Sequence, residues 1–206
     1  MANKNLIEKQ IESQWESDYS KADMPNMPWE AFKPPSRLVR LIGSGKIGIG
    51  KAIDLGCGLG TNAIYLAKMG FEATALDISE TALKYASERA SKENVKIDFI
   101  KGFAHKLDFP EKTFTLVFDR GCFHHVPEEL RDDYLSEIHR VLADKGSYYL
   151  ECFSSNCAFD FGCRFSKADI KKIFGEKFDI LEMEEIKNKG HNGEEIVLNS
   201  VFMVKR

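Results

Sequence analysis

The sequence predicts an α/β fold: a doubly wound, mostly parallel, seven-stranded sheet with a C-terminal antiparallel hairpin. Three observations support this. From residue 51 onward, short apolar runs alternate with helical stretches, which is typical of a parallel sheet covered on both faces. A glycine-rich turn follows the first apolar run directly. At the end of the chain, residues 178–186 and 196–205 flank a polar, glycine-containing link at 188–193, which indicates a hairpin.

The N-terminal part is predicted to be a helix followed by an irregular segment. Apolar side chains at Leu6, Ile7, Ile11 and Trp15 recur near helical spacing, so residues 3–20 are expected to form an amphipathic helix. Several prolines follow. Because proline fixes φ and lacks an N–H, we expect the chain there to be extended or turned.

The rest of the chain is expected to alternate between helices and strands. Ser36 is expected to cap a short helix that glycines from Gly43 onward end. The strands expected next are residues 51–55, 72–76, 95–100, 113–118 and 146–153. The helices expected among them are residues 61–69, 79–91, 128–142 and 166–174, with Ser79 and Ser166 as caps. We therefore expect an N-terminal helix and lid segment at 1–35 and an α/β domain at 36–206.

Composition narrows the class of protein. The chain has 206 residues, of which 43% are hydrophobic and 30% charged, as in ordinary globular domains. The net charge of −3 and the lack of a basic stripe argue against a nucleic-acid partner. No secretory signal and no bilayer-spanning apolar run is evident, so we expect a cytoplasmic protein without a membrane partner. The oligomeric state is left open.

Cysteine and histidine usage suggests no metal site. Five cysteines in a reducing compartment are expected to be free thiols. Whether Cys152, Cys157 and Cys163 hold a metalloid is left open, because their spacing matches no known metal pattern. His105 and His139 have no partner pattern and are expected at the surface.

The segment AIDLGCGLGTNAIYLA is predicted to bind the ligand. Asp54 ends a strand, Gly56, Gly58 and Gly60 follow, and a helix begins at once. Glycines allow a sharp turn and a close approach of the ligand, and free N–H groups at the helix start face it. Asp77 ends the next strand, where a carboxylate can accept two ribose hydroxyl hydrogen bonds.

Two other interpretations of this loop remain open. Gly58, Gly60 and Ala63 also fit the dinucleotide pattern GxGxxG/A. Against it, the Asp54 carboxylate would repel a pyrophosphate but suits an ammonium group, the chain has no separate substrate domain, and the sheet ends in a hairpin. The second alternative is a glycine turn that serves packing alone.

The stretches AIDLGCGLG and ALDIS resemble the cofactor motifs of class I S-adenosylmethionine-dependent methyltransferases, over roughly residues 35–206. The resemblance implies S-adenosyl-L-methionine as cofactor. It implies that the glycine loop, with Cys57, passes under the methionine part, that Asp77 holds the ribose, and that Ile78 packs against adenine. In KGFAHKLDF, Phe103 stands where many members have an acidic residue that contacts adenine, so this chain lacks the usual carboxylate. The contacts to adenine are expected instead from the side chain of Phe103 and the backbone of Ala104.

The stretch FTLVFDRGCFHHVP is predicted to line the reaction centre, because it follows a strand at the topological switch point. Asp119 is expected beside the cofactor, and Arg120, Phe123 and His125 beside the substrate. His124 is the candidate general base, since imidazole titrates near neutrality. The alternative, a histidine that packs or bonds to backbone at a helix entry, stays open.

A finer resemblance concerns the N-terminal segment. WESDYSKADMPNMPWEAFKPPSRLVRLI is similar to the entry segment of the thiopurine methyltransferase-like group, which includes thiol, halide and tellurite-related enzymes. The match rests on Tyr19, Pro28, Trp29 and Pro34. The resemblance implies that this segment closes over the cofactor, with Trp29 as part of the cap. A role for Trp29 as a core anchor stays open.

The sequence thus predicts methyl transfer to a small-molecule acceptor, such as a thiol or another soft nucleophile. The protein would mainly position the nucleophile and exclude water. The alternatives are a non-catalytic S-adenosylmethionine-binding protein and an RNA methyltransferase, which would need a basic surface at the site.

Overall fold

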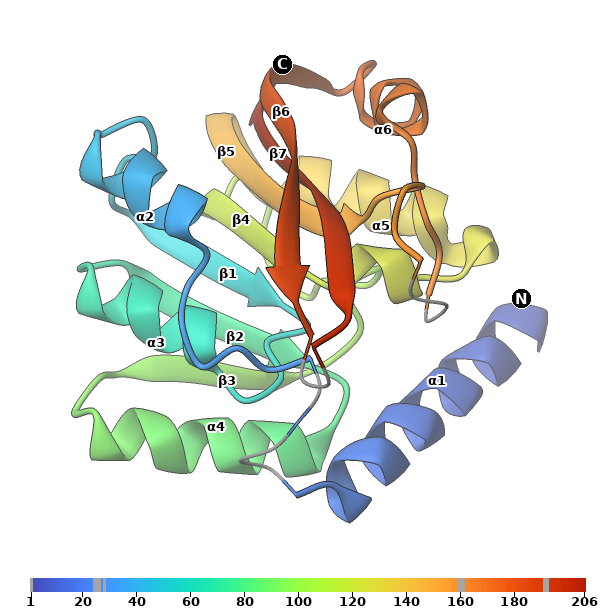
Figure 1. Cartoon of the computed structure of the whole chain (residues 1–206). Helices are drawn as coiled ribbons and strands as arrows, with labels where there is room; N and C mark the ends of the chain where they lie inside the picture. The colour runs from blue at the N-terminus through green and yellow to red at the C-terminus, as the bar shows by residue number, and fades with distance from the viewer. Residues whose placement is uncertain (1, 24–26, 28, 159–161, 191–192) are drawn as a thin grey trace.

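The computed structural model describes residues 2–23, 27, 29–158, 162–190 and 193–206, and within them a seven-stranded sheet forms the centre (Figure 1). The strands are β1 (Lys51–Leu55), β2 (Glu72–Asp77), β3 (Ile97–Lys101), β4 (Phe114–Arg120), β5 (Leu142–Phe153), β6 (Phe178–Lys189) and β7 (Glu195–Lys205). Their order is β3-β2-β1-β4-β5-β7-β6. Strands β1 to β5 are parallel, and β7 runs antiparallel to both β5 and β6. The predicted fold class is confirmed.

The helices cover both faces of the sheet. They are α1 (Ala2–Lys21), α2 (Ser36–Gly43), α3 (Thr61–Lys68), α4 (Glu80–Lys92), the 3₁₀ turn η2 (Phe123–His125), α5 (Glu128–Val141) and α6 (Lys167–Phe174). One apolar cluster joins α2 and α3 to one face through Leu38 and Leu66. Another joins α5 and α6 to the opposite face through Tyr134 and Phe174. The central strands are consequently buried on both sides, which explains their continuous apolar runs.

Local capping signals were mostly predictive. The Ser79 side chain accepts from the Ala82 N–H at 3.1 Å, and Ser166 forms a capping box with Asp169. Ser36 was expected to be a cap, but it is the first helical residue of α2, and Pro35 precedes it without a side-chain cap. A proline there fixes a φ that leads into the helix, so no capping hydroxyl is required.

The start of β5 differs from the prediction. It was expected at residue 146 but begins at Leu142, directly after α5. Leu142 pairs with Phe114, and the register shifts before Leu116 pairs with Ser147. The polar, glycine-containing stretch between these pairs resembles a loop in sequence, and it forms an irregular part of the strand in which Lys145 has a φ of 60°.

Helix α1 docks on the body of the domain through two parallel stripes, and Figure 1 shows it on the side toward which the β1 arrow points. The polar stripe recurs every four residues and comprises Lys4, Glu8, Glu12 and Glu16. Lys4 pairs with Asp133 at 2.5 Å, and Glu8 pairs with His105 at 2.8 Å. Glu12 pairs with Lys101 at 2.8 Å, and Glu16 accepts from the Ser79 hydroxyl at 2.8 Å. The apolar stripe beside it comprises Ile7, Ile11, Trp15 and Tyr19. Helix α1 therefore forms a wall at the carboxyl ends of the strands.

The position of His105 corrects one expectation. It was placed at the surface, but its side chain is buried and its Nε2 lies 2.8 Å from Glu8 Oε1. The partner is 97 residues away in sequence, so no local pattern could reveal it. None of the helices in the described ranges is long and apolar enough to cross a membrane.

Candidate functional site

A cavity of about 730 Å³ opens at the carboxyl ends of β2, β4 and β5, between these ends and α1. Most of the expected site residues line it: Trp29, Gly56, Asp77, Ile78, Phe103, Ala104, Arg120, His124 and His125. The others lie behind its wall: Asp54, Cys57, Gly58, Gly60, Asp119 and Phe123. The location agrees with the general rule that open α/β sheets bind ligands beyond the carboxyl ends of their strands.

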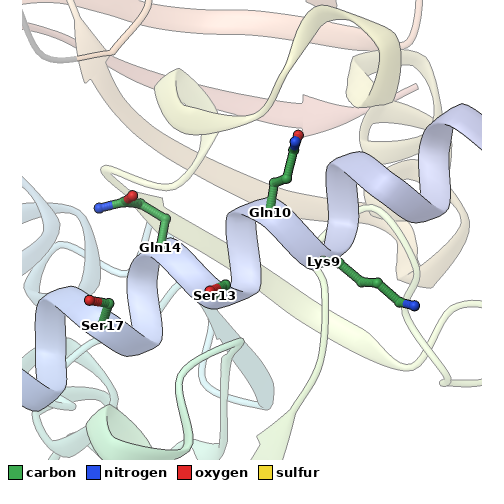
Figure 2. Close-up of a pocket in the computed structure, with 5 residues that line it drawn as sticks. All are labelled: Lys9, Gln10, Ser13, Gln14 and Ser17. Carbon is green, nitrogen blue, oxygen red and sulfur yellow. The ribbon is translucent and has the colours of Figure 1, made fainter.

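A second hollow lies on the outer face of α1 and does not belong to this site. The described residues that line it are Lys9, Gln10, Ser13, Gln14 and Ser17, all from one helix (Figure 2). Figure 2 shows their side chains spread along α1, which carries all five of them. A ligand there would meet one polar helix face only, so the cavity at the strand ends is the better site.

The glycine loop adopts the conformation that its sequence predicts. Gly56 and Gly58 have φ of 62° and 51°, in the left-handed region that side chains disfavour. A Cβ on Gly58 would lie 2.8 Å from the Tyr19 hydroxyl, so Tyr19 of α1 packs directly on this loop. Close packing and positive φ together require glycine here.

Asp77 joins the loop to the next strand. Its Oδ2 accepts from the Gly58 N–H at 2.8 Å, and its Oδ1 accepts from the Ser79 N–H at 2.9 Å. Burial raises the pKa of Asp77, while these N–H groups favour the ionised form. Each carboxylate oxygen can accept a second hydrogen bond, and Asp77 lines the cavity, so it can still hold a diol.

Asp54 offers a test of whether the chain fits S-adenosylmethionine. Its carboxylate is buried at the end of β1, and its Oδ2 has no hydrogen-bond partner within the described residues. Burial raises the pKa of Asp54 well above its ordinary value. An uncompensated buried acceptor at the glycine loop suits a cationic ammonium group and would repel a pyrophosphate. Together with the Asp77 carboxylate, this acceptor fits an amino-acid-bearing nucleoside, whose ammonium and ribose hydroxyl groups are donors.

Arg120 and Glu151 form an ion pair in the cavity wall. Arg120 Nε donates to Glu151 Oε2 at 3.0 Å, and the Tyr149 hydroxyl donates to Glu151 Oε1 at 2.7 Å. Glu151 is 1% exposed, and burial raises its pKa while Arg120 opposes that shift. Sequence reasoning missed Glu151, although a single acid inside the apolar run of β5, YYLECF, was an available signal.

The two histidines sit side by side in the wall. His124 is buried, its Nδ1 accepts from the Phe153 N–H at 3.2 Å, and its ring stacks on Phe153 at 3.9 Å. Burial lowers the pKa of His124 well below its ordinary value, and burial lowers the pKa of His125 to about 4. Since Nδ1 of His124 accepts, the neutral ring carries its proton on Nε2. This geometry favours the packing alternative for His124 over the base.

Two expected contacts face the core instead. Phe123 was assigned to the substrate, but it is fully buried and packs on Phe165 and Phe174 at 4.8 and 5.1 Å. Asp119 was expected beside the cofactor, but its carboxylate accepts from the Phe123 N–H at 3.0 Å and from the Tyr134 hydroxyl. Phe123 is carried inward by the 3₁₀ turn η2, and Asp119, near the end of β4, is held there by the N–H group of Phe123 and the hydroxyl of Tyr134.

An aromatic wall completes the site on the side of α1. Trp15 lies 5.0 Å from the His125 ring and 5.8 Å from the Trp29 ring, measured between centroids. Trp29 Nε1 donates to the Tyr19 hydroxyl at 3.4 Å. Trp29 lines the cavity as expected, whereas Trp15 was expected only as part of an amphipathic helix. Pro28, one of the residues on which the finer N-terminal resemblance rests, lies outside the described residues.

The cysteines do not gather into a metal site. Cys152 and Cys157 are buried, and Cys163 is exposed. Within the described ranges, no group of three histidine, cysteine or acidic side chains is placed to hold a metal ion.

Comparisons with known proteins agree with this geometry. Residues 52–146 match a family described as a methyltransferase domain. Over 151 residues the chain is 30% identical to the 2-heptyl-1-hydroxyquinolin-4(1H)-one methyltransferase of Mycobacteroides abscessus, covering 71% of this chain and 65% of that protein. Over 125 residues it is 29% identical to thiocyanate methyltransferase 1 of Brassica oleracea, covering 58% and 53%. The chain thus spans less than two thirds of the length of either relative.

Solved structures share the fold. The 1,6-didemethyltoxoflavin-N1-methyltransferase of Burkholderia thailandensis matches with a TM-score of 0.77 and 20% identity, over 95% of this chain and 87% of that one. TehB of Haemophilus influenzae matches with a TM-score of 0.69 and 20% identity, over 82% and 62%.

Proposed function

Because the chain belongs to the class I S-adenosylmethionine-dependent methyltransferases, we propose that it transfers a methyl group to a small-molecule acceptor in the cavity beside Asp77 and Arg120. The observation that carries the proposal is the pair of carboxylates beside the glycine loop. Asp77 lines the cavity, and Asp54 is buried with an Oδ2 atom that has no hydrogen-bond partner within the described residues. S-adenosyl-L-methionine supplies an activated methyl group on a sulfonium.

The protein's own residues bind and orient. Asp77 holds the ribose, Ile78 and Phe103 flank the adenine, and the backbone of Gly56 and Gly58 contacts the methionine part. Asp54 faces the amino group. Residues 1–35 act as a wall and lid, because the α1 stripes dock on the body and carry Trp15 and Tyr19 to the cavity. This enclosure excludes water from the site of transfer.

The nature of the acceptor is the finer part of the proposal. The cavity is lined by the polar pair of Arg120 and Glu151 and by a row of aromatic side chains. A soft nucleophile such as a thiolate fits, because displacement at a sulfonium needs little beyond a positioned lone pair. His125 contacts the acceptor, and His124 holds the β5 end in place rather than taking a proton. The relatives named above act on a hydroxyquinolinone, thiocyanate and a toxoflavin precursor, which supports a small molecule.

The test has two stages. Isothermal titration with S-adenosylmethionine, S-adenosylhomocysteine and NAD is expected to show binding of the first two only. A screen that measures S-adenosylhomocysteine release then compares thiols, halides, amines and hydroxylated small molecules, with a short RNA as a further arm. Tight NAD binding without sulfonium binding would end the proposal, and binding without turnover of any acceptor would favour a non-catalytic binding protein.

A further inference from the structure

The cavity combines a row of aromatic side chains with the guanidinium group of Arg120. The rings of Trp29, Trp15 and His125 follow one another at centroid distances of 5.8 and 5.0 Å. Phe153 continues this row, 6.4 Å from His125. All four line the cavity. The neighbouring rings stand nearly perpendicular to one another, at 88°, 78° and 80°, so they present both edges and faces to a ligand. Such a lining favours an aromatic ring over a flexible aliphatic chain, because aromatic rings pack edge to face or offset at these spacings.

Among the described residues, three cationic side chains line the cavity, namely Lys33, Lys189 and Arg120. The two lysines are exposed, whereas Arg120 is partly buried and uses only part of its hydrogen-bonding capacity. Within the described residues its guanidinium bonds Glu151 through Nε, and its two terminal nitrogens have no acceptor. The side chain lines the cavity and is 20% exposed. Guanidinium N–H groups form their strongest hydrogen bonds with anions. The free end of Arg120 is therefore an anion-binding group beside the aromatic row.

We infer that the acceptor is a planar aromatic acid, with an acidic hydroxyl or thiol, that binds as its anion with the charged atom facing Arg120. This inference rests on the proposed methyl transfer and names its substrate class. A lone pair of the ionised oxygen or sulfur forms the bond to the methyl carbon, and the methyl–sulfonium bond breaks with its electron pair on sulfur. The positive and negative charges cancel, and no proton has to leave in the step.

Among the titratable groups that line the cavity, His124, His125 and Glu151 are poorly suited to act as a base. His124 uses Nδ1 to accept from the Phe153 N–H, and burial keeps His125 neutral with a pKa of about 4. Both Glu151 oxygens are engaged, one by Arg120 and one by the Tyr149 hydroxyl. A substrate that arrives ionised removes the need for a base.

Glu151 is the positioning residue in this arrangement. Its carboxylate is fixed by the Tyr149 hydroxyl, which itself lies 2.9 Å from the Ser200 hydroxyl. It holds the Nε edge of Arg120, which leaves the terminal nitrogens available on a side chain that lines the cavity. The variant Glu151→Gln keeps a carbonyl oxygen that can accept from Arg120 Nε, whereas Glu151→Ala removes this acceptor.

The experiment uses the full chain with S-adenosylhomocysteine present and a chromophoric probe, 4-nitrophenol, whose absorption spectrum reports its ionisation. We expect the bound probe to ionise at lower pH than the free probe. In Arg120→Gln the phenolate affinity should fall about 10- to 100-fold, the usual range for losing a charge-assisted hydrogen bond. Glu151→Ala should resemble Arg120→Gln, and Glu151→Gln should retain most of the affinity. Arg40→Gln, at an exposed arginine of α2, is the matched control.

A second experiment measures the rate of methyl transfer to two phenols of different acidity, 4-nitrophenol and phenol. It also measures the rate with 4-nitrothiophenol, in which sulfur is the nucleophile. The acidic limb of kcat/KM should shift with the pKa of the acceptor. A limb fixed at one pH for both phenols, together with inactivity of Glu151→Gln, would instead make Glu151 a base and overturn the inference. Binding of the neutral phenol, or no probe binding at all, would also overturn it.

These readings separate the inference from the proposed function. Probe ionisation is measured without methyl transfer, so a bound phenolate sustains the inference whether or not turnover follows. Conversely, loss of S-adenosylhomocysteine binding in Arg120→Gln would assign Arg120 to the cofactor and overturn the inference while leaving methyl transfer in place. Rapid methylation of 2-mercaptoethanol without methylation of any aromatic acceptor would also overturn the inference and leave methyl transfer in place.

Discussion

The Asp77 carboxylate accepts a hydrogen bond from the Gly58 N–H at 2.8 Å, which joins the end of β2 to the glycine loop after β1. A second N–H, from Ser79 at the start of α4, bonds the other oxygen. The carboxylate thus fixes the loop and also faces the cavity. One side chain thus organises the loop and lines the cavity, where we propose that it binds the ribose.

Asp77→Ala should weaken S-adenosylmethionine binding by about 1–3 kcal/mol, because a charge-assisted partner of the ribose is lost. Asp77→Asn is the matched variant: it keeps an acceptor for one N–H and should lose less. Isothermal titration measures both, and circular dichroism checks the fold. An unchanged dissociation constant in the alanine variant would show that another residue holds the ribose.

Gly58→Ala should both strain the loop and push on α1. A positive φ costs a non-glycine residue about 1–2 kcal/mol, and the new Cβ would meet the Tyr19 hydroxyl at 2.8 Å. Gly45→Ala is the control, since Gly45 has φ of 73° with open space around it. Chemical denaturation should show a loss of stability in both, whereas titration should show weaker cofactor binding only in Gly58→Ala. Equal cofactor affinities would mean that the loop does not contact the cofactor.

Trp29→Ala should weaken cofactor binding about tenfold, because the indole covers the cavity and holds Tyr19. Phe32→Ala provides the comparison, since Phe32 is equally exposed at 43% but lies over Arg89. We also expect amide exchange of residues 29–35 to slow when the cofactor binds. Exchange that is the same with and without cofactor would make this segment ordinary packing rather than a lid.

Asp119→Asn should change how stability depends on pH. Burial raises the pKa of Asp119 to about 7, so the folded chain holds a proton that the unfolded chain releases near pH 4. This contribution to stability is complete below about pH 4 and is lost as the pH rises through 7. Over that range the wild type should lose up to about 4 kcal/mol relative to the variant, at about 1.4 kcal/mol per pKa unit. Parallel stability curves from urea melts would show that Asp119 titrates normally.

Local patterns were enough to predict much of this protein. The glycine turn, Asp77 and the Ser79 and Ser166 caps each depend on a few neighbouring residues, so their chemistry can be recognised from the chain alone. The alternation of strands and helices likewise reflects burial on both sides of a parallel sheet, and it identified the strand ends where the cavity lies. The sequence by itself therefore determined the fold class, the cofactor and the binding edge.

Only the tertiary structure decided which side chains face the cavity. The η2 turn has no strand or helix periodicity, so nothing in DRGCFHHVP indicated that Phe123 would point into the core while Arg120 lines the site. The pairing of Arg120 with Glu151 depends on β4 lying beside β5, and the bond between Glu8 and His105 spans 97 residues. Such contacts arise from packing between distant segments, because the free energy that selects them is gained only when the whole sheet and α1 have assembled.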